Sequence, residues 1–404
     1  MTCGSCPVVA RCMGVSAKVA AIGCVALPRL CTTFPVGEGT YEARTSIRRH
    51  ISAVPRHGPP CEKTTMALTE LHGVTHASAD PFAEVIEHRF TFSQQILGAR
   101  FRFEGNDQAL VDVAQATYAG LPRHRLPIAA PEFRIELRLL PRRPGATSVE
   151  PPPARVQSGA GLLCSVMDAS NYVVLAPGQR RALVVVSADM LDEPYHVRYE
   201  LIEFAVFVLA TRGLGLVPLH GACVGRGGRG VLVLGASGAG KSTLALHSLL
   251  RGLDFLAEDA VFVRPESLLA TGVPNFLHVR ADALGFIDDD VTRRWIGQSP
   301  MIRRRSGVEK FEADLRLGQF KMAEQPMELT AAVFVSSEPA SGARLVNRLT
   351  VSDATSRLLA EQPYACTQPG WRCFEERLTR RGVHELKRGR HPGDSVDALL
   401  TLLA

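Results

Sequence analysis

Residues 230–242 read Gly-Val-Leu-Val-Leu-Gly-Ala-Ser-Gly-Ala-Gly-Lys-Ser, and residues 243–251 continue as Thr-Leu-Ala-Leu-His-Ser-Leu-Leu-Arg. The apolar run 230–234 predicts a buried strand, and 243–251 predicts a helix. The eight residues 235–242 match G-x-x-x-x-G-K-[ST], the pattern of a phosphate-binding loop, in the strand–loop–helix context that this motif requires. We therefore expect an α/β fold built around this loop.

The loop offers three kinds of group to a nucleotide. Its backbone N–H groups can surround phosphate oxygens, and the start of the following helix adds a positive dipole end. Lys241 is expected to meet the β and γ phosphates, and Ser242 to supply a ligand for Mg²⁺. The residues expected to bind ATP are Gly235, Ser237, Gly238, Ala239, Gly240, Lys241, Ser242 and Thr243.

Two acids and one histidine flank this segment. Glu258 and Asp259 interrupt the apolar stretch 255–263, which predicts a strand that ends and restarts at the acids. One helix away from the loop, both carboxylates can reach the same magnesium and γ-phosphate region; the alternative is a solvated turn. His220 begins the strand 219–224, which the glycine-rich link 225–230 joins as a hairpin to the loop strand. We expect His220 either to contact the reacting carboxylate or to be an ordinary core histidine.

These segments together resemble a known family. Leu219-His220-Gly221, the loop 235–242, Leu250-Arg251-Gly252 and Ala257-Glu258-Asp259 resemble the C-terminal catalytic domain of HPr kinase/phosphorylase and its stand-alone relatives in order and spacing. The resemblance implies a P-loop kinase core of the type shared with phosphoenolpyruvate carboxykinase. It also implies transfer of the ATP γ-phosphate to a protein serine, with Glu258 as general base, His220 as its partner, and Asp259 with Ser242 as Mg²⁺ ligands. From the loop motif itself we expect Lys241 to steady the transferred charge.

The chain departs from that family at named positions. Glu258 stands where the family commonly has Asp, and Thr243 follows the loop serine where the bifunctional enzymes usually have Glu. We therefore leave open whether phosphorolysis occurs and whether the acceptor is a protein, a peptide or a small molecule. Two further alternatives are a simple ATPase and a catalytically inactive module that senses ATP.

A basic cluster follows the acids. Arg303, Arg304 and Arg305 are consecutive, and the planar guanidinium group suits bidentate phosphate binding. We expect the cluster to bind phosphate or an acidic substrate; a solvated run of charge is the competing interpretation.

The rest of the chain predicts a smaller α+β domain ahead of the kinase domain. Its expected elements lie in 66–190: a hairpin (88–92 and 99–103), a helix (107–119) and strands (133–140, 162–167, 172–176 and 181–187). A connecting helix is expected over 191–213, ended by Gly213, with His196 and Tyr199 as packing residues. The kinase domain is expected over 214–404, with a strand at 328–336 and helices at 353–361 and 395–403.

Composition bounds the function. Residues 1–65 carry a net charge of +5 and six of the ten cysteines, whereas the other residues carry only +1. We expect a leader over 1–65 that is disordered or mis-started, and no nucleic-acid binding, because the main body shows no basic footprint. The longest apolar run, 204–210, is far shorter than the roughly 20 residues of a membrane span. The expected protein is cytoplasmic and free of membrane contacts, and a homo-oligomer is one option.

Overall fold

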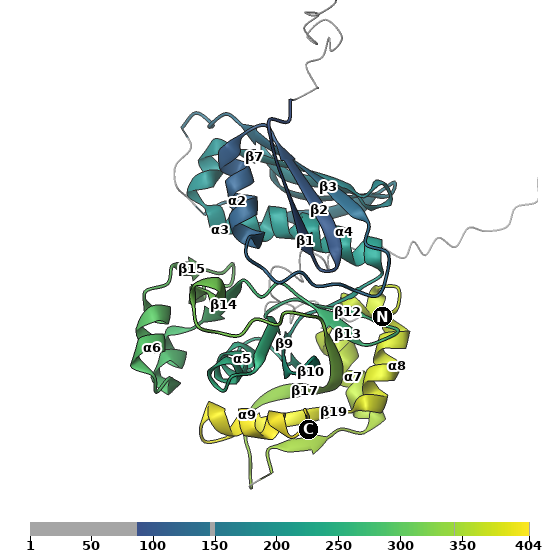
Figure 1. The fold of residues 1–404 in the computed structure, drawn as a ribbon, viewed down its shortest axis with the longest axis vertical. Helices are drawn as coiled ribbons and strands as arrows, with labels where there is room; N and C mark the ends of the chain where they lie inside the picture. The colour runs from purple at the N-terminus through teal and green to yellow at the C-terminus, as the bar shows by residue number, and fades with distance from the viewer. Residues whose placement is uncertain (1–86, 146–149, 343, 404) are drawn as a thin grey trace, which may run out of the picture. The chain divides into compact units, whose positions relative to one another are not determined.

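The strand, loop and helix of the phosphate-loop motif form in the predicted order. The computed structural model describes residues 87–145, 150–342 and 344–403, so the expected leader over 1–65 lies outside it. Strand β10 (Arg229–Leu234) leads into residues 235–240, called here the glycine-rich loop, and helix α5 (Lys241–Leu250) follows directly. Figure 1 shows these elements beside β9 (Ala222–Arg226) and β17 (Met327–Pro339).

Strand β10 lies inside a nine-stranded mixed sheet. The order is β11-β9-β10-β17-β13-β12-β8, with β19 beside β17 and β18 beside β19. The other strands are β8 (Val217–Leu219), β9 (Ala222–Arg226), β11 (Asp254–Ala257), β12 (Val261–Arg264), β13 (Leu269–Thr271), β17 (Met327–Pro339), β18 (Val346–Arg348) and β19 (Val383–Arg388). Strands β10, β17 and β19 are parallel, so their carboxyl ends meet at one edge of the sheet.

Helices cover both faces of this sheet. Leu232 and Leu234 of β10 pack on one face with α7 (Val351–Glu361) and α8 (Trp371–Arg381). Val231 and Val233 point to the other face, toward α5 and α9 (Pro392–Leu400). Because both faces are buried, β10 is apolar at every position from 231 to 234, as the sequence predicted. The α/β class is confirmed.

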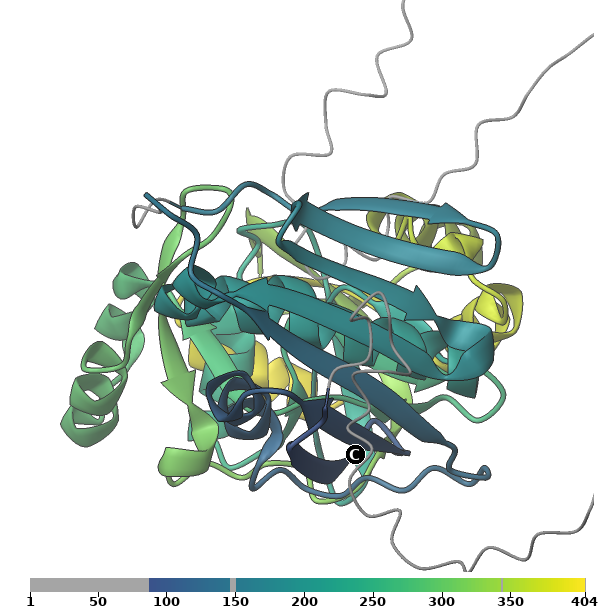
Figure 2. The ribbon, with the colours of Figure 1, turned by 90° about the horizontal axis from the view of Figure 1, so that it is seen from above.

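An N-terminal sheet has seven strands in the order β1-β2-β3-β7-β6-β5-β4. They are β1 (Phe90–Ile96), β2 (Ala99–Gly105), β3 (Glu132–Leu140), β4 (Arg155–Gly159), β5 (Leu162–Asp168), β6 (Asn171–Ala176) and β7 (Arg181–Ser187), and α2 (Gln108–Tyr118) packs beside them. Figure 2 shows the strands side by side, with β1 and β2 at one edge. The predicted hairpin, helix and strands are confirmed; β4 was missed because it is mostly exposed and lacks a regular apolar alternation.

The helix expected over 191–213 is not one regular helix. It consists of α3 (Pro194–His196), a π-helical segment η5 (Val197–Ile202) and α4 (Glu203–Leu214). The prediction that Gly213 ends it is wrong. Gly215 ends α4 in a left-handed conformation, with φ of 64°. Gly213 lies inside α4, where a Cβ atom would meet the Phe133 ring at 2.3 Å, so a close contact explains this glycine.

A small three-stranded sheet that the sequence analysis did not anticipate completes the fold. Its order is β14 (Phe276–Val279), β16 (Glu309–Asp314) and β15 (Met301–Arg303), and α6 (Asp290–Gly297) packs near it. This sheet brings His278 and Arg304 to the acids Glu258 and Asp259, and Glu312 to His278. In the part of the chain that the structure describes, every helix is too short or too polar to cross a membrane.

Candidate active site

Two breaks in neighbouring strands lie opposite one another. The chain leaves the sheet between β8 and β9 at His220, and between β11 and β12 at Glu258 and Asp259. The register brings these breaks together, because Leu219 pairs with Val261 and Cys223 with Ala257. The sequence predicted the break at the acids, and the pairing explains why a histidine and two acids distant in sequence share one place.

His220 contacts the main chain of this turn. Its Nδ1 lies 3.2 Å from the Asp259 carbonyl oxygen, whereas the expected partner was the Glu258 carboxylate. A carbonyl only accepts, so Nδ1 carries the proton. Burial and the charge of Lys241 lower the pKa of His220 to about 4, so the ring is neutral near pH 7.

Lys241, the first residue of α5, makes hydrogen bonds back to the glycine-rich loop. Lys241 Nζ donates to the carbonyl oxygens of Gly235 (2.6 Å) and Ala236 (3.1 Å). Gly235 has φ of 138°, and a Cβ atom there would lie 2.8 Å from the Val335 carbonyl oxygen, so only glycine fits. Burial lowers the pKa of Lys241, and neighbouring carboxylates oppose this effect. The loop therefore presents a partly buried ammonium group at the start of α5.

The loop serine meets the first acid of the pair. Ser242 Oγ donates a hydrogen bond to Glu258 Oε1, and Glu258 Oε2 accepts one from the backbone N–H of His278 at 2.8 Å. Burial alone would raise the pKa of Glu258, but the hydrogen bond from His278 and nearby positive charge bring it below its ordinary value. Glu258 is therefore an ionised carboxylate held against the first turn of α5.

The second acid turns toward different partners. Asp259 has a left-handed backbone, with φ of 65°, and its Oδ2 accepts from Arg304 Nη2 at 2.6 Å. Tyr199 Oη donates to the same oxygen at 3.3 Å and accepts from Arg304 Nη1 at 2.9 Å. Burial opposes ionisation of Asp259, but Arg304 holds its pKa well below the usual range. Ser242, expected to share a cation with Asp259, contacts Glu258 instead.

The three consecutive arginines point to different places. Arg303 lies exposed on β15. Arg305 forms an ion pair with Glu200 at 2.7 Å and also contacts the Pro151 carbonyl, so it links η5 to the loop at Pro151. Of these three residues, Arg304 is the one with a hydrogen bond to the acid pair.

Four residues of the site were not predicted from the sequence: Arg198, Tyr199, His278 and Glu312. His278 Nε2 contacts Glu312 Oε1 at 3.1 Å, and Arg198 binds both oxygens of Glu312. Tyr199, expected to be a packing residue, makes polar contacts within the site instead. These residues come from η5, β14 and β16. Their signal in the sequence is weak: for His278 it is a lone histidine between the apolar residues Leu277 and Val279.

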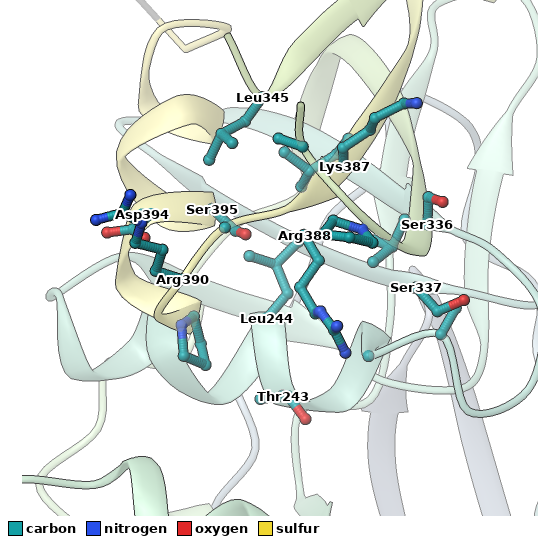
Figure 3. A pocket seen from close by; sticks show the side chains of 18 of the residues that line it. Thr243, Leu244, Ser336, Ser337, Leu345, Lys387, Arg388, Arg390, Asp394 and Ser395 are labelled. Carbon is teal, nitrogen blue, oxygen red and sulfur yellow. The ribbon is translucent and has the colours of Figure 1, made fainter. Parts of the chain in front are cut away.

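A cavity of about 1030 Å³ adjoins the loop. It lies beyond the carboxyl ends of β17 and β19, and Gly238 and Gly240 of the loop form part of its wall. In Figure 3 the side chain of Arg388 reaches from β19 toward the loop end of α5, and Ser337 lies on the same side. Pockets at the carboxyl ends of parallel strands are common ligand sites in α/β folds.

Comparison of the chain with protein-family models and with curated proteins gives no match.

Proposed function

We propose that this chain binds ATP with a divalent cation and transfers the γ-phosphate to a hydroxyl group, with a serine of a protein or peptide as the favoured acceptor. The observation that carries the proposal is the hydrogen bond from Ser242 Oγ to Glu258 Oε1. It joins the last residue of the phosphate-loop motif to the acid pair. The groups suited to phosphate and to a cation therefore meet at one point.

The nucleotide would occupy the loop and the adjoining cavity. Backbone N–H groups at the start of α5 have no side-chain cap, which suits them to phosphate oxygens. Lys241 would exchange the carbonyl oxygens of Gly235 and Ala236 for phosphate oxygens. The cavity along β17 and β19 offers room for the base and ribose.

The contacts favour a cation-binding role for the acid pair. Ser242, Glu258 and Asp259 offer the oxygen atoms that Mg²⁺ prefers. A bound Mg²⁺ would neutralise phosphate charge during transfer. This gives Glu258 a different role from the general base implied by the family resemblance, because its Oε1 already faces the loop serine. Phosphoryl transfer depends mainly on positioning and charge stabilisation, so a dedicated base is not essential.

A second candidate function is an ATP sensor without catalysis. The ion pair between Arg304 and Asp259 favours it, because the guanidinium occupies one oxygen of an expected cation ligand. In a kinase, Arg304 would instead bind a phosphate oxygen when nucleotide enters. The two functions differ in whether phosphate leaves ATP.

Single-turnover transfer from γ-labelled ATP tests the proposal. The full chain would be mixed with Mg²⁺ and labelled ATP, first with water as the only acceptor and then with a library of serine-containing peptides. A kinase gives labelled peptide faster than free phosphate, and Lys241→Ala removes both signals. Tight ATP binding with no transfer to water or peptide would overturn the kinase proposal and favour the sensor, whereas transfer to water alone would indicate an ATPase.

A further inference from the structure

His278 lies buried between the two acids with one ring nitrogen unsatisfied. Its side chain is 4% exposed, and its Nδ1 has no hydrogen-bond partner. This nitrogen lies 3.6 Å from Glu258 Oε2 and 3.8 Å from Asp259 Oδ2. Buried polar atoms are normally paired, so an orphan at this point needs a physical explanation.

The other ring nitrogen fixes the tautomer. His278 Nε2 lies 3.1 Å from Glu312 Oε1, and Glu312 is itself held by Arg198. Arg198 donates to both carboxylate oxygens of Glu312, so this carboxylate is ionised and acts as an acceptor. Nε2 therefore donates, and in the neutral ring Nδ1 presents its lone pair to two carboxylates. Three acceptors facing one another require a positive group between them.

We propose that Glu258, Asp259 and His278 bind a first-row transition-metal ion, with Mn²⁺ or Co²⁺ favoured over Mg²⁺. Ligand atoms of these residues lie within 4.8 Å of one another. Ligands bonded at about 2.1 Å to one ion are roughly 3 to 3.5 Å apart, so the measured separations need only a small contraction. The proposal deepens the proposed function, since it identifies the cation that the acid pair would hold.

The ligand chemistry sets the preference. Imidazole nitrogen suits transition metals, whereas Mg²⁺ prefers oxygen ligands alone. A carboxylate on the second nitrogen of a metal-binding histidine is a common orienting contact, and Glu312 supplies it with Arg198 behind. Asp259 Oδ2 also accepts from Arg304, but a carboxylate offers about four lone pairs, so it can bind an ion as well.

Metal binding by the full chain without nucleotide tests the inference. Metal-free protein would be titrated with Mn²⁺, with free ion followed by electron paramagnetic resonance, and then with Mg²⁺ in competition. We expect one Mn²⁺ per chain, bound at least about tenfold more tightly than Mg²⁺. His278→Gln should weaken Mn²⁺ binding by about 10- to 100-fold and leave Mg²⁺ binding nearly unchanged. Co²⁺ should show a visible spectrum that changes in the same variant.

Controls separate a failed site from a failed fold or a failed kinase. His247→Gln alters another buried histidine with an unpartnered ring nitrogen and should keep Mn²⁺ binding. Lys241→Ala should keep it too, because the ion needs no nucleotide. Absence of phosphate transfer by the wild-type chain, with its Mn²⁺ binding intact, would overturn the kinase alone. Equal Mn²⁺ affinity in His278→Gln and wild type, or no Mn²⁺ bound by folded wild type, would overturn the metal site.

Discussion

The side-chain amide of Gln362 binds both backbone polar groups of His220. Its Oε1 accepts from the His220 N–H at 2.8 Å, and its Nε2 donates to the His220 carbonyl at 2.9 Å. His220 lies where the chain leaves the sheet between β8 and β9, so the amide replaces the missing ladder partner. Gln362, directly after α7, thereby fixes the histidine beside Asp259.

Gln362→Ala should destabilise the fold strongly. It leaves two buried backbone groups unpaired, and each costs about 1 to 3 kcal/mol, so the free energy of unfolding should fall by about 2 to 6 kcal/mol. Urea unfolding measures this change. Gln108→Ala is the control, because Gln108 is exposed and its amide contacts Asp112; it should cost no more than about 0.5 kcal/mol. Equal losses in the two variants would contradict the role given to Gln362.

Local patterns predicted the parts of the site that lie close together in sequence. The order of apolar, glycine and polar residues over 230–242 predicted the loop, its strand and its helix. The two acids could be identified because they interrupt an apolar strand. Register then brought His220 to them. Apolar periodicity predicts each of these strands, and strands that are neighbours in sequence commonly pair with one another.

The rest of the site depends on long-range pairing that no local pattern records. His278, Arg304 and Glu312 arrive through the pairing of β14, β16 and β15. The sequence also could not predict which of the two acids contacts Ser242, because this depends on the left-handed turn at Asp259. A lone histidine in an apolar strand gives the same signal whether it packs in a core or faces two carboxylates.

Lys241→Ala should remove most nucleotide affinity. Two charge-assisted hydrogen bonds to phosphate contribute about 3 kcal/mol or more, so the affinity for MgATP should fall by at least about 100-fold in isothermal titration calorimetry. Lys321→Ala is the matched control, since Lys321 is an exposed lysine that pairs with Asp254. Unchanged MgATP affinity in a folded Lys241→Ala protein would contradict the phosphate-loop assignment.

Filling the cavity should weaken binding of the nucleoside part of ATP without weakening binding of the phosphates. Ser337 lines the cavity, so Ser337→Trp should weaken ATP binding about tenfold through steric exclusion and leave inorganic tripolyphosphate binding nearly unchanged. Ser337→Ala, which frees space, should leave both affinities as they are. If Ser337→Trp weakens the two ligands equally, the base and ribose do not occupy this cavity.

Acid should destabilise the fold through His220. Its pKa is about 4 in the folded chain, against about 6.5 unfolded, so between these values the unfolded chain binds a proton that the folded chain does not. The free energy of unfolding therefore falls as pH drops through this range, by up to about 3 kcal/mol from this residue, and is level above it. His220→Asn should lose that part of the slope between pH 7 and 4.5 in urea titrations; an unchanged slope would show that His220 is accessible to protons.

That slope will not vanish entirely in the variant. Burial lowers the pKa of His247 to about 4 and also lowers that of His124, so both add to it with the same sign. Glu258 and Asp259 have lowered pKa values, so their contribution is lost only at lower pH, below the usual range of carboxylates. The comparison between His220→Asn and wild type isolates the one residue.

The roles of the two acids can be separated by paired amide variants. If Glu258 holds the cation with Ser242, Glu258→Gln should weaken MgATP or MnATP binding by about tenfold or more and lower transfer in proportion. If Glu258 were instead the general base, the same variant should bind nucleotide normally and lose about 10² to 10⁴ in transfer rate. The hydrogen bond between Ser242 Oγ and Glu258 Oε1 favours the first outcome.

Asp259→Asn provides the comparison, with Arg304→Ala as a third variant. Removing the Asp259 charge should also weaken cation-dependent nucleotide binding, and it leaves Arg304 without its carboxylate partner. Arg304→Ala frees that carboxylate, so it should strengthen Mn²⁺ binding without nucleotide yet slow phosphate transfer if Arg304 contacts the transferred group. Calorimetry for affinity and rapid-quench single turnover for transfer, run on all three variants, measure both quantities. Normal nucleotide binding in Glu258→Gln with transfer abolished would return the general-base role to Glu258.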